Sequence, residues 1–138
     1  YKQFMDIVIL RLFFVYGKMQ KSSMLIPRLI TNVRENNLIS LQGSNGIFMN
    51  PIHVSDSVSS VLAALKLKGS HKINVAGPEV LSLKAICELI GNKVGIQPIF
   101  EHDMQSLPRH LVADTTNMTR LLVIPRRSMS EGLDEMVK

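Results

Sequence analysis

Tryptophan is absent from this 138-residue sequence, and aromatic residues of all kinds make up only 5% of it. Proteins that stack nucleic-acid bases use aromatic side chains for this purpose, so the scarcity argues against such a protein. Cys87 is the only cysteine, which excludes an internal disulfide. It lies in an apolar stretch with helical spacing, and we expect a buried, reduced thiol there and not a nucleophile.

Long apolar runs are also missing. The longest, residues 7–15, is interrupted by Arg11 and is far shorter than the roughly 20 residues that a membrane-spanning helix needs. The first residues do not have the pattern of a secretory signal peptide. We therefore expect a cytoplasmic protein with no membrane contact.

Charge is present but is not concentrated. Hydrophobic residues make up 46% of the chain and charged residues 20%, which is typical of a globular protein. Lysine and arginine outnumber the acidic residues by 16 to 11, giving a net charge of +5. The densest basic group is only the pair Arg126 and Arg127. A nucleic-acid-binding protein is one hypothesis for a basic chain, but scattered charge and few aromatics count against it, and we expect no nucleic-acid partner.

The segment 6–17, DIVILRLFFVYG, is predicted to be a β-strand that needs burial on both faces, because apolar residues occupy both parities. This pattern is typical of an inner strand of a parallel sheet. It occurs within the first residues, with no earlier strand to pair with. We therefore expect that an N-terminal part is missing. We also expect this strand to pair with some other edge, such as that of another chain, or to be poorly ordered.

Helices and strands are expected to alternate along the rest of the chain, which indicates a single α/β unit. Ser22 and Ser23 should cap the first helix, Ser55 or Asp56 the second, and Ser82 the third, which Gly95 should follow. The helices are expected at 24–35, from 55 or 56 to Gly69, at 83–94, from Asp114 to 122, and from Ser128, with a capping box to Glu131, to 137. The strands are expected at 38–41, 48–54, 72–75 and 97–101.

Several short segments together resemble a known protein family, although a single one of them would be too short to indicate it. Residues 10–17, LRLFFVYG, resemble the LRxxNVYGP segment of extended short-chain dehydrogenases/reductases, the NAD-dependent epimerase/dehydratase family of nucleotide-sugar enzymes. The later segments follow in that family's order: LIP at 25–27, LQG at 41–43, NPIHVSD at 50–56, INVAG at 73–77, SL at 82–83, and RLL with Pro125 and EGL at 120–133.

The resemblance implies a particular part of that family's fold. Its N-terminal Rossmann lobe carries a Gly-x-x-Gly-x-x-Gly phosphate loop and a catalytic Tyr-x-x-x-Lys pair, and neither motif occurs here. Residues four positions after Tyr1 and Tyr16 are Met5 and Gln20. We therefore expect one unit, 1–138, made of a residual Rossmann strand (1–17) and the C-terminal substrate-binding lobe (18–138), with the Rossmann lobe missing and no catalytic residue.

The resemblance also implies a function. The parent protein would be an NAD(P)-dependent nucleotide-sugar epimerase, dehydratase or reductase, a homodimer that binds NAD or NADP and a small-molecule nucleotide-sugar. This fragment would contribute substrate binding, bind no cofactor by itself, and be inactive alone. The alternative is an atypical, non-catalytic family member that acts as a binding or regulatory module.

By resemblance, the cofactor-binding residues are Tyr16, Gly17 and Lys18, where backbone must approach the nicotinamide. Lys18 replaces the proline that the family has at this position. The family's asparagine, often a substrate ligand, is Phe14 here, for which we favour core packing.

Substrate-binding positions are transferred in the same way. Met49 stands where epimerases have an arginine that pairs with the substrate diphosphate, and Arg109 lies in the loop that carries a second such arginine. The predicted set is Met24, Leu25, Leu41, Gln42, Met49 and Arg109.

Histidine and aspartate residues are predicted to be structural. His53 should be buried and hydrogen-bonded at a helix entry, and Asp56 should favour the dipole of that helix. His102, Asp103 and His110 do not have metal-ligand spacing with the cysteine at position 87, so we expect no metal.

Overall fold

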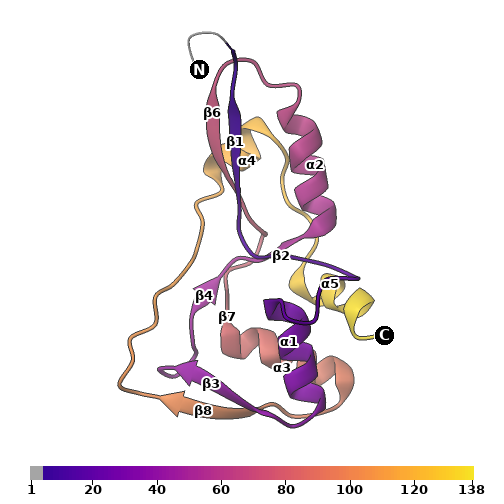
Figure 1. Ribbon diagram of the computed structural model, residues 1–138, viewed down its shortest axis with the longest axis vertical. Helices are drawn as coiled ribbons and strands as arrows, with labels where there is room; N and C mark the ends of the chain where they lie inside the picture. The colour runs from indigo at the N-terminus through magenta and orange to yellow at the C-terminus, as the bar shows by residue number, and fades with distance from the viewer. Residues whose placement is uncertain (1–4) are drawn as a thin grey trace.

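The computed structural model describes residues 5–138 and shows two halves stacked along the long axis (Figure 1). The upper half contains β1, β6, α2 and α4, and the lower half contains α1, α3, β3 and β8, with α5 beside the junction (Figure 1). The elements are β1 (Val8–Leu12), β2 (Val15–Tyr16), α1 (Leu25–Arg34), β3 (Leu38–Gln42), β4 (Phe48–Met49), β5 (Ile52–His53), α2 (Val54–Ala64), β6 (His71–Val75), β7 (Leu81–Ser82), α3 (Leu83–Val94), β8 (Ile99–Asp103), α4 (Thr116–Leu121) and α5 (Met129–Met136).

The upper half is built on parallel strand pairs. β1 pairs with β6 in a register that runs from Val8 opposite His71 to Leu12 opposite Val75, and β2 pairs with β5. Helix α2 follows β5 and precedes β6, and so links the two strand pairs. The predicted α/β class is confirmed.

The first strand differs from its sequence-based expectation. Residues 8–12 have a partner within the same chain, because β6 pairs with them in parallel. The predicted segment is also not one strand. Phe14 has a φ of 46° and separates β1 from β2, so the chain turns there and the two pieces pair with different strands. Burial on both faces is not reached either, since Ile9 is 44% and Leu12 48% exposed.

The lower half holds most of the apolar core. β3 pairs in parallel with β8, and its Ile39 and Leu41 point inward while their neighbours are exposed. Helices α1 and α3 pack on one another beside this pair (Figure 1). The core of this half is formed by Tyr16, Ile26, Leu29, Ile30, Val33, Ile39, Leu41, Met49, Ile86, Cys87, Ile90, Met129 and Leu133.

Two of the predicted helix boundaries are confirmed by their caps. The side chain of Ser82 accepts a hydrogen bond from the backbone N–H of Ala85, and Gly95 follows α3 in the left-handed conformation. Ser128 and Glu131 form the predicted capping box at the start of α5.

Three other expected helix starts were wrong. The N-cap residue of α4 is Thr115, and not the expected Asp114. His53 caps α2, because its ring nitrogen accepts a hydrogen bond from the backbone N–H of Ser55, and the helix ends at Ala64, before the expected Gly69. Met24 precedes α1 without any side-chain cap, so neither Ser22 nor Ser23 fills this role.

Candidate functional site

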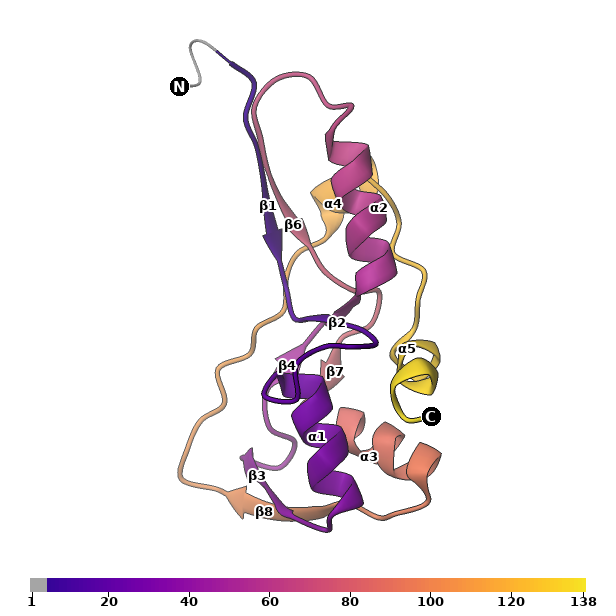
Figure 2. The ribbon, with the colours of Figure 1, turned by 45° about the vertical axis from the view of Figure 1, so that its right-hand side comes forward.

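A cavity of about 600 Å³ lies between the loop that follows β2 and the first turn of α1. The loop passes directly above the start of α1 in the rotated view of Figure 2. Most of the lining side chains are apolar, and those of Tyr16, Lys18 and Gln20 are the polar exceptions. The lining residues are Phe14, Val15, Tyr16, Gly17, Lys18, Met19, Gln20, Met24, Leu25, Ile26 and Val54.

Local interactions give the loop its path. The Gln20 side-chain N–H₂ donates to the carbonyl of Val15 over 2.9 Å, which folds the loop back toward β2. Met19, at the tip, has a φ of 67° and is 95% exposed. Pro27 falls in the first turn of α1, where its missing N–H costs no helical hydrogen bond. The chain therefore enters α1 facing the loop, with the cavity between them.

The three residues predicted to bind the cofactor have different surroundings. Tyr16 is only 1% exposed, and its hydroxyl donates to the carbonyl of Ser128 over 3.3 Å. Burial raises the pKa of this phenol well above its usual range, so it stays protonated and is not placed as a base. Gly17 is buried so close to α2 that an added Cβ would lie 2.6 Å from Cγ1 of Val54. Lys18 is exposed at the edge of the cavity.

The six residues predicted to bind substrate separate into two groups. Met24 and Leu25 line the cavity together with the predicted cofactor residues. Leu41 and Met49 have no exposed surface and pack in the lower core. Gln42 and Arg109 are exposed and do not line the cavity. Arg109 precedes the segment that bridges to β4, since the N–H of Leu111 donates to the carbonyl of Phe48.

Some residues of the site were not found from the sequence. Val54 lines the cavity, and its position directly after His53 in the recognised IHV segment could have suggested this. Met19 and Gln20 belong to no motif, and nothing in the sequence pointed to them. Phe14, expected in the core, packs on the core and also lines the cavity.

The predicted structural role of His53 is confirmed. The side chain is 3% exposed, caps α2, and meets the ring of Tyr16 edge to face, with 5.4 Å between ring centroids. Asp56 lies in the first turn of α2 as predicted, and its carboxylate also accepts hydrogen bonds from the backbone N–H groups of Arg126 and Arg127.

Metal and thiol chemistry find no support at this site. Among residues 5–138, no group of three or more histidine, cysteine, aspartate or glutamate side chains is arranged to hold a metal ion. Cys87 is buried, and burial raises the pKa of its thiol to about 12, so the group is not a nucleophile at neutral pH. Within the same residues, no helix has the length and apolar character needed to cross a membrane.

Comparison with known proteins assigns the chain to a family. The model of the NAD dependent epimerase/dehydratase family matches residues 1–76, more than half of the sequence. The chain belongs to this family. This confirms the resemblance on which the expected site residues were based. No curated protein matches the chain.

Several solved structures share the fold of this epimerase/dehydratase chain. UDP-glucuronic acid 4-epimerase from Bacillus cereus, in complex with UDP-glucuronic acid and NAD, is 29% identical with a TM-score of 0.80, over 94% of this chain and 43% of its own. dTDP-glucose 4,6-dehydratase from Bacillus anthracis, in complex with NAD, is 23% identical with a TM-score of 0.76, over 94% and 43%. UDP-glucose 4-epimerase from Thermotoga maritima, with UDP-glucose, is 18% identical with a TM-score of 0.77, over 94% and 44%. The chain thus spans less than half the length of these proteins.

Proposed function

We propose that this chain forms the substrate side of an NAD(P)-dependent nucleotide-sugar enzyme, with Tyr16 to Lys18 toward the cofactor and Met24 and Leu25 toward the substrate. The observation that carries the proposal is the shared cavity. Two segments that the family resemblance assigns to cofactor and substrate face each other across it. A mostly apolar cavity with a few polar groups at its edge is the usual form of a small-molecule site.

The residues of the chain fit one wall of a cofactor site. Gly17 brings backbone to the cavity without a side chain, and the exposed ammonium group of Lys18 suits a phosphate or carboxylate. The solved relative from Bacillus cereus contains NAD and UDP-glucuronic acid. In such an enzyme, bound NAD(P) would accept and return a hydride, while this chain would orient the sugar and exclude water.

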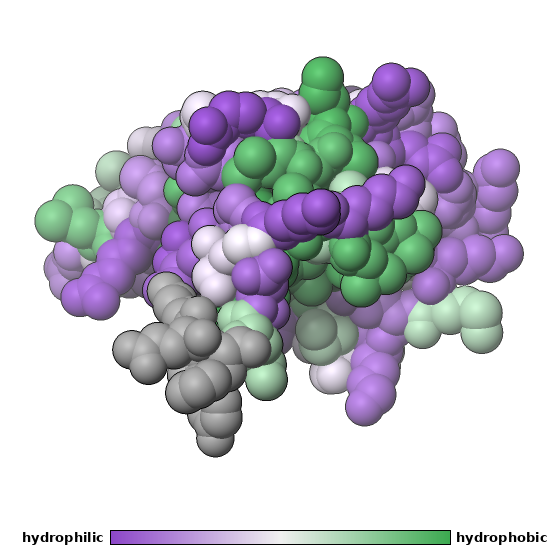
Figure 3. Space-filling model, turned by 90° about the horizontal axis from the view of Figure 1, so that it is seen from above, coloured by the Kyte–Doolittle hydropathy of each residue, from purple (hydrophilic) through white to green (hydrophobic). Residues whose placement is uncertain are grey.

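An exposed apolar surface supports a second lobe on the upper half. Along α2 and just beyond its end, Val58, Val61, Leu62 and Leu65 are between 43% and 77% exposed, and they recur at helical spacing. Figure 3, a view from above, shows hydrophobic side chains grouped among hydrophilic ones. Parallel sheets are normally covered by helices on both faces. The sheet of β1 and β6 has only two strands. We propose that a nucleotide-binding lobe continues this sheet and covers α2.

A non-catalytic binding module is the second candidate. It is favoured by Met49. This residue stands where epimerases have a diphosphate-binding arginine, but its side chain is uncharged and has no exposed surface. The roles predicted for Leu41, Gln42, Met49 and Arg109 in substrate binding therefore stay predictions, and the proposal does not depend on them.

The encoding gene separates these two candidates. For an enzyme, we expect the reading frame upstream of the codon for Tyr1 to encode a Gly-x-x-Gly-x-x-Gly loop and a Tyr-x-x-x-Lys pair. An upstream lobe without that pair would favour the binding module. A gene with no upstream nucleotide-binding lobe would contradict both the enzyme and the two-lobe arrangement.

Activity then tests the cavity itself. The protein encoded by the whole reading frame is incubated with NAD and UDP-glucuronic acid, UDP-glucose or dTDP-glucose, and nucleotide-sugar products are separated by chromatography. We expect turnover of at least one substrate, and an approximately tenfold or greater loss of kcat/KM in Met24→Lys, which places a charge in the apolar wall. The control is Met104→Lys, because Met104 is 68% exposed and lies outside the cavity. Equal activity of the two variants would exclude this cavity as the site.

A further inference from the structure

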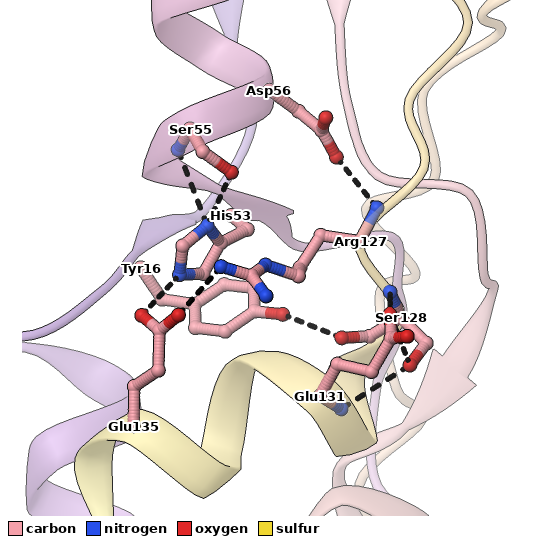
Figure 4. Close-up of polar contacts among 8 residues, drawn as sticks. All are labelled: Tyr16, His53, Ser55, Asp56, Arg127, Ser128, Glu131 and Glu135. Atoms are coloured by element: carbon pink, nitrogen blue, oxygen red, sulfur yellow. Dashed lines mark hydrogen bonds and ion pairs between the residues drawn. The ribbon is translucent and has the colours of Figure 1, made fainter.

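Helix α5 is joined to the wall of the cavity by a set of polar contacts (Figure 4). Nε2 of His53 lies 3.2 Å from Oε2 of Glu135, a distance within ion-pair range although the alignment is not that of a hydrogen bond. The other carboxylate oxygen of Glu135 accepts from the guanidinium of Arg127 over 2.5 Å. One carboxylate of α5 thus contacts both the residue that caps α2 and a residue just before α5.

The tautomer of neutral His53 follows from its other nitrogen. Nδ1 lies 3.2 Å from the backbone nitrogen of Ser55, which can only donate, and 2.7 Å from the Ser55 hydroxyl, which can donate as well, so Nδ1 is placed as an acceptor. The proton of a neutral imidazole therefore resides on Nε2, the nitrogen that faces Glu135. The two ring nitrogens thus have distinct roles, since Nδ1 begins α2 and Nε2 faces α5.

Tyr16 contacts both His53 and the residue that precedes α5. Its ring meets His53 edge to face, and its hydroxyl donates to the carbonyl of Ser128 just before α5 (Figure 4). Gly132 of α5 lies so close to the same ring that an added Cβ would overlap the hydroxyl. The position of α5 therefore sets the position of Tyr16, and with it that of Gly17 and Lys18 in the cavity wall.

We propose that His53 and Glu135 are positioning residues that lock α5 against Tyr16 and thereby hold the 16–20 wall of the cavity in place. The contact joins residues 82 positions apart in the chain. Asp56 strengthens the lock by accepting from the backbone N–H groups of Arg126 and Arg127, at 3.0 and 2.9 Å. The significance of the lock for ligands depends on the proposed function, whereas its existence does not.

The first test compares two neighbouring carboxylates of α5 by amide hydrogen exchange, without any ligand. Glu135→Ala should increase exchange about tenfold at the amide of Gln20, which donates to the carbonyl of Gly17, because the wall loses its support. Asp134→Ala is the control, since Asp134 pairs with Lys93 on α3, over 2.6 Å, and not with the wall. Amides of α3 should be unchanged by Glu135→Ala. An unchanged wall in Glu135→Ala, or equal loosening in Asp134→Ala, would overturn the proposal.

A second variant separates the two roles of the imidazole. His53→Asn retains an oxygen that can cap α2, because asparagine is a favourable N-cap residue, but it has no second nitrogen to face Glu135. We expect wall exchange to rise as in Glu135→Ala, with α2 still protected. The double variant should loosen the wall by less than the sum of the two single effects, and full additivity would contradict a direct coupling. If His53→Asn does not fold, Glu135→Ala and its control decide alone.

The lock and the proposed function can fail separately. Absence of nucleotide-sugar turnover by the whole protein, with wall exchange raised in Glu135→Ala and not in Asp134→Ala, would reject the function and keep the lock. Normal turnover in Glu135→Ala, with an unchanged wall, would reject the lock and keep the function.

Discussion

The two halves of the molecule differ in how completely they bury their own apolar surface. Thirteen buried residues form the core of the lower half, whereas four, namely Ile52, Ile73, Val75 and Met118, form that of the upper half. The inner face of α2 offers only Ser57, Ser60 and Ala64, while its valines and leucines are exposed. Because stabilisation follows apolar area removed from water, the lower half should be the more stable of the two.

The largest expected effect comes from the junction of the halves. Gly77 follows β6, and its N–H donates to the carbonyl of Asn50 over 2.9 Å. In Gly77→Ala, the new Cβ would overlap the backbone oxygen of Pro51, which no side-chain movement can relieve. We expect a loss of about 4 kcal/mol or more, enough to unfold many domains, measured by urea denaturation.

Gly95→Ala is the matched control for this change. Nothing lies within 4 Å of the added Cβ, so only the left-handed backbone opposes it. We expect a cost of about 1 kcal/mol. Similar losses in the two variants would show that the junction is not tightly packed.

Matched truncations test the difference between the halves directly. Ile90 is fully buried in the lower core, and Leu62 is 57% exposed on α2. Ile90→Ala should cost about 3 kcal/mol in free energy of unfolding, and Leu62→Ala less than about 0.5 kcal/mol. A large loss in Leu62→Ala would mean that α2 is covered in solution, for example by self-association, which sedimentation would detect.

A smaller loss of stability is expected where Asn50 holds the loop between β8 and α4 by hydrogen bonds. Asn50 is buried and bonds Ala113 twice, donating to its carbonyl and accepting from its N–H, both over 2.9 Å. Asn50→Ala would leave both backbone groups unpaired and should cost about 2 kcal/mol. Asn37→Ala, which removes only exposed hydrogen bonds, is the control and should be nearly neutral.

The smallest expected effect concerns acid stability at the start of α5. The backbone N–H of Ser128 donates to the Glu131 carboxylate, the side chain of Ser128 adds a second contact, and together they lower the pKa of that carboxyl group. A lowered pKa in the folded state means that the contact stabilises the fold above the ordinary glutamate pKa. This contribution is lost as the pH falls through the lowered value. Carboxyl ¹³C titration should show the pKa rise partway in Ser128→Ala, because the backbone donor remains. No rise would contradict the capping box.

Local signals in the sequence were sufficient for much of the fold. Ser82 and Gly95 bounded α3, and Ser128 with Glu131 began α5, because helix ends have strong side-chain preferences. The residue predicted to cap α2 was wrong, because the acceptor there is the imidazole of His53 and not the usual hydroxyl or carboxylate. The partner of the first strand was not predicted, because it lies 63 residues away, beyond the reach of any local pattern.

The candidate site was predictable only where a motif marked it. The predicted residues that line the cavity lie in or beside segments that the family resemblance marks, namely Tyr16, Gly17, Lys18, Met24 and Leu25. The contact of His53 with Glu135 was not found, since it joins an internal segment to the last helix and depends on packing. The burial of Met49 was not predicted either, because alignment to a family position does not show which way a side chain points.

The long separation between β1 and β6 also has a consequence during synthesis. Val8 cannot meet its partner His71 until 63 further residues have been added. At about 5–20 residues per second, the ribosome takes roughly 3–13 s to add them. Throughout that time the apolar strand lacks this partner, and an unpaired strand edge favours aggregation or chaperone binding. The strand Val8–Leu12 therefore gains its partner only after more than half of the 138 residues have been made.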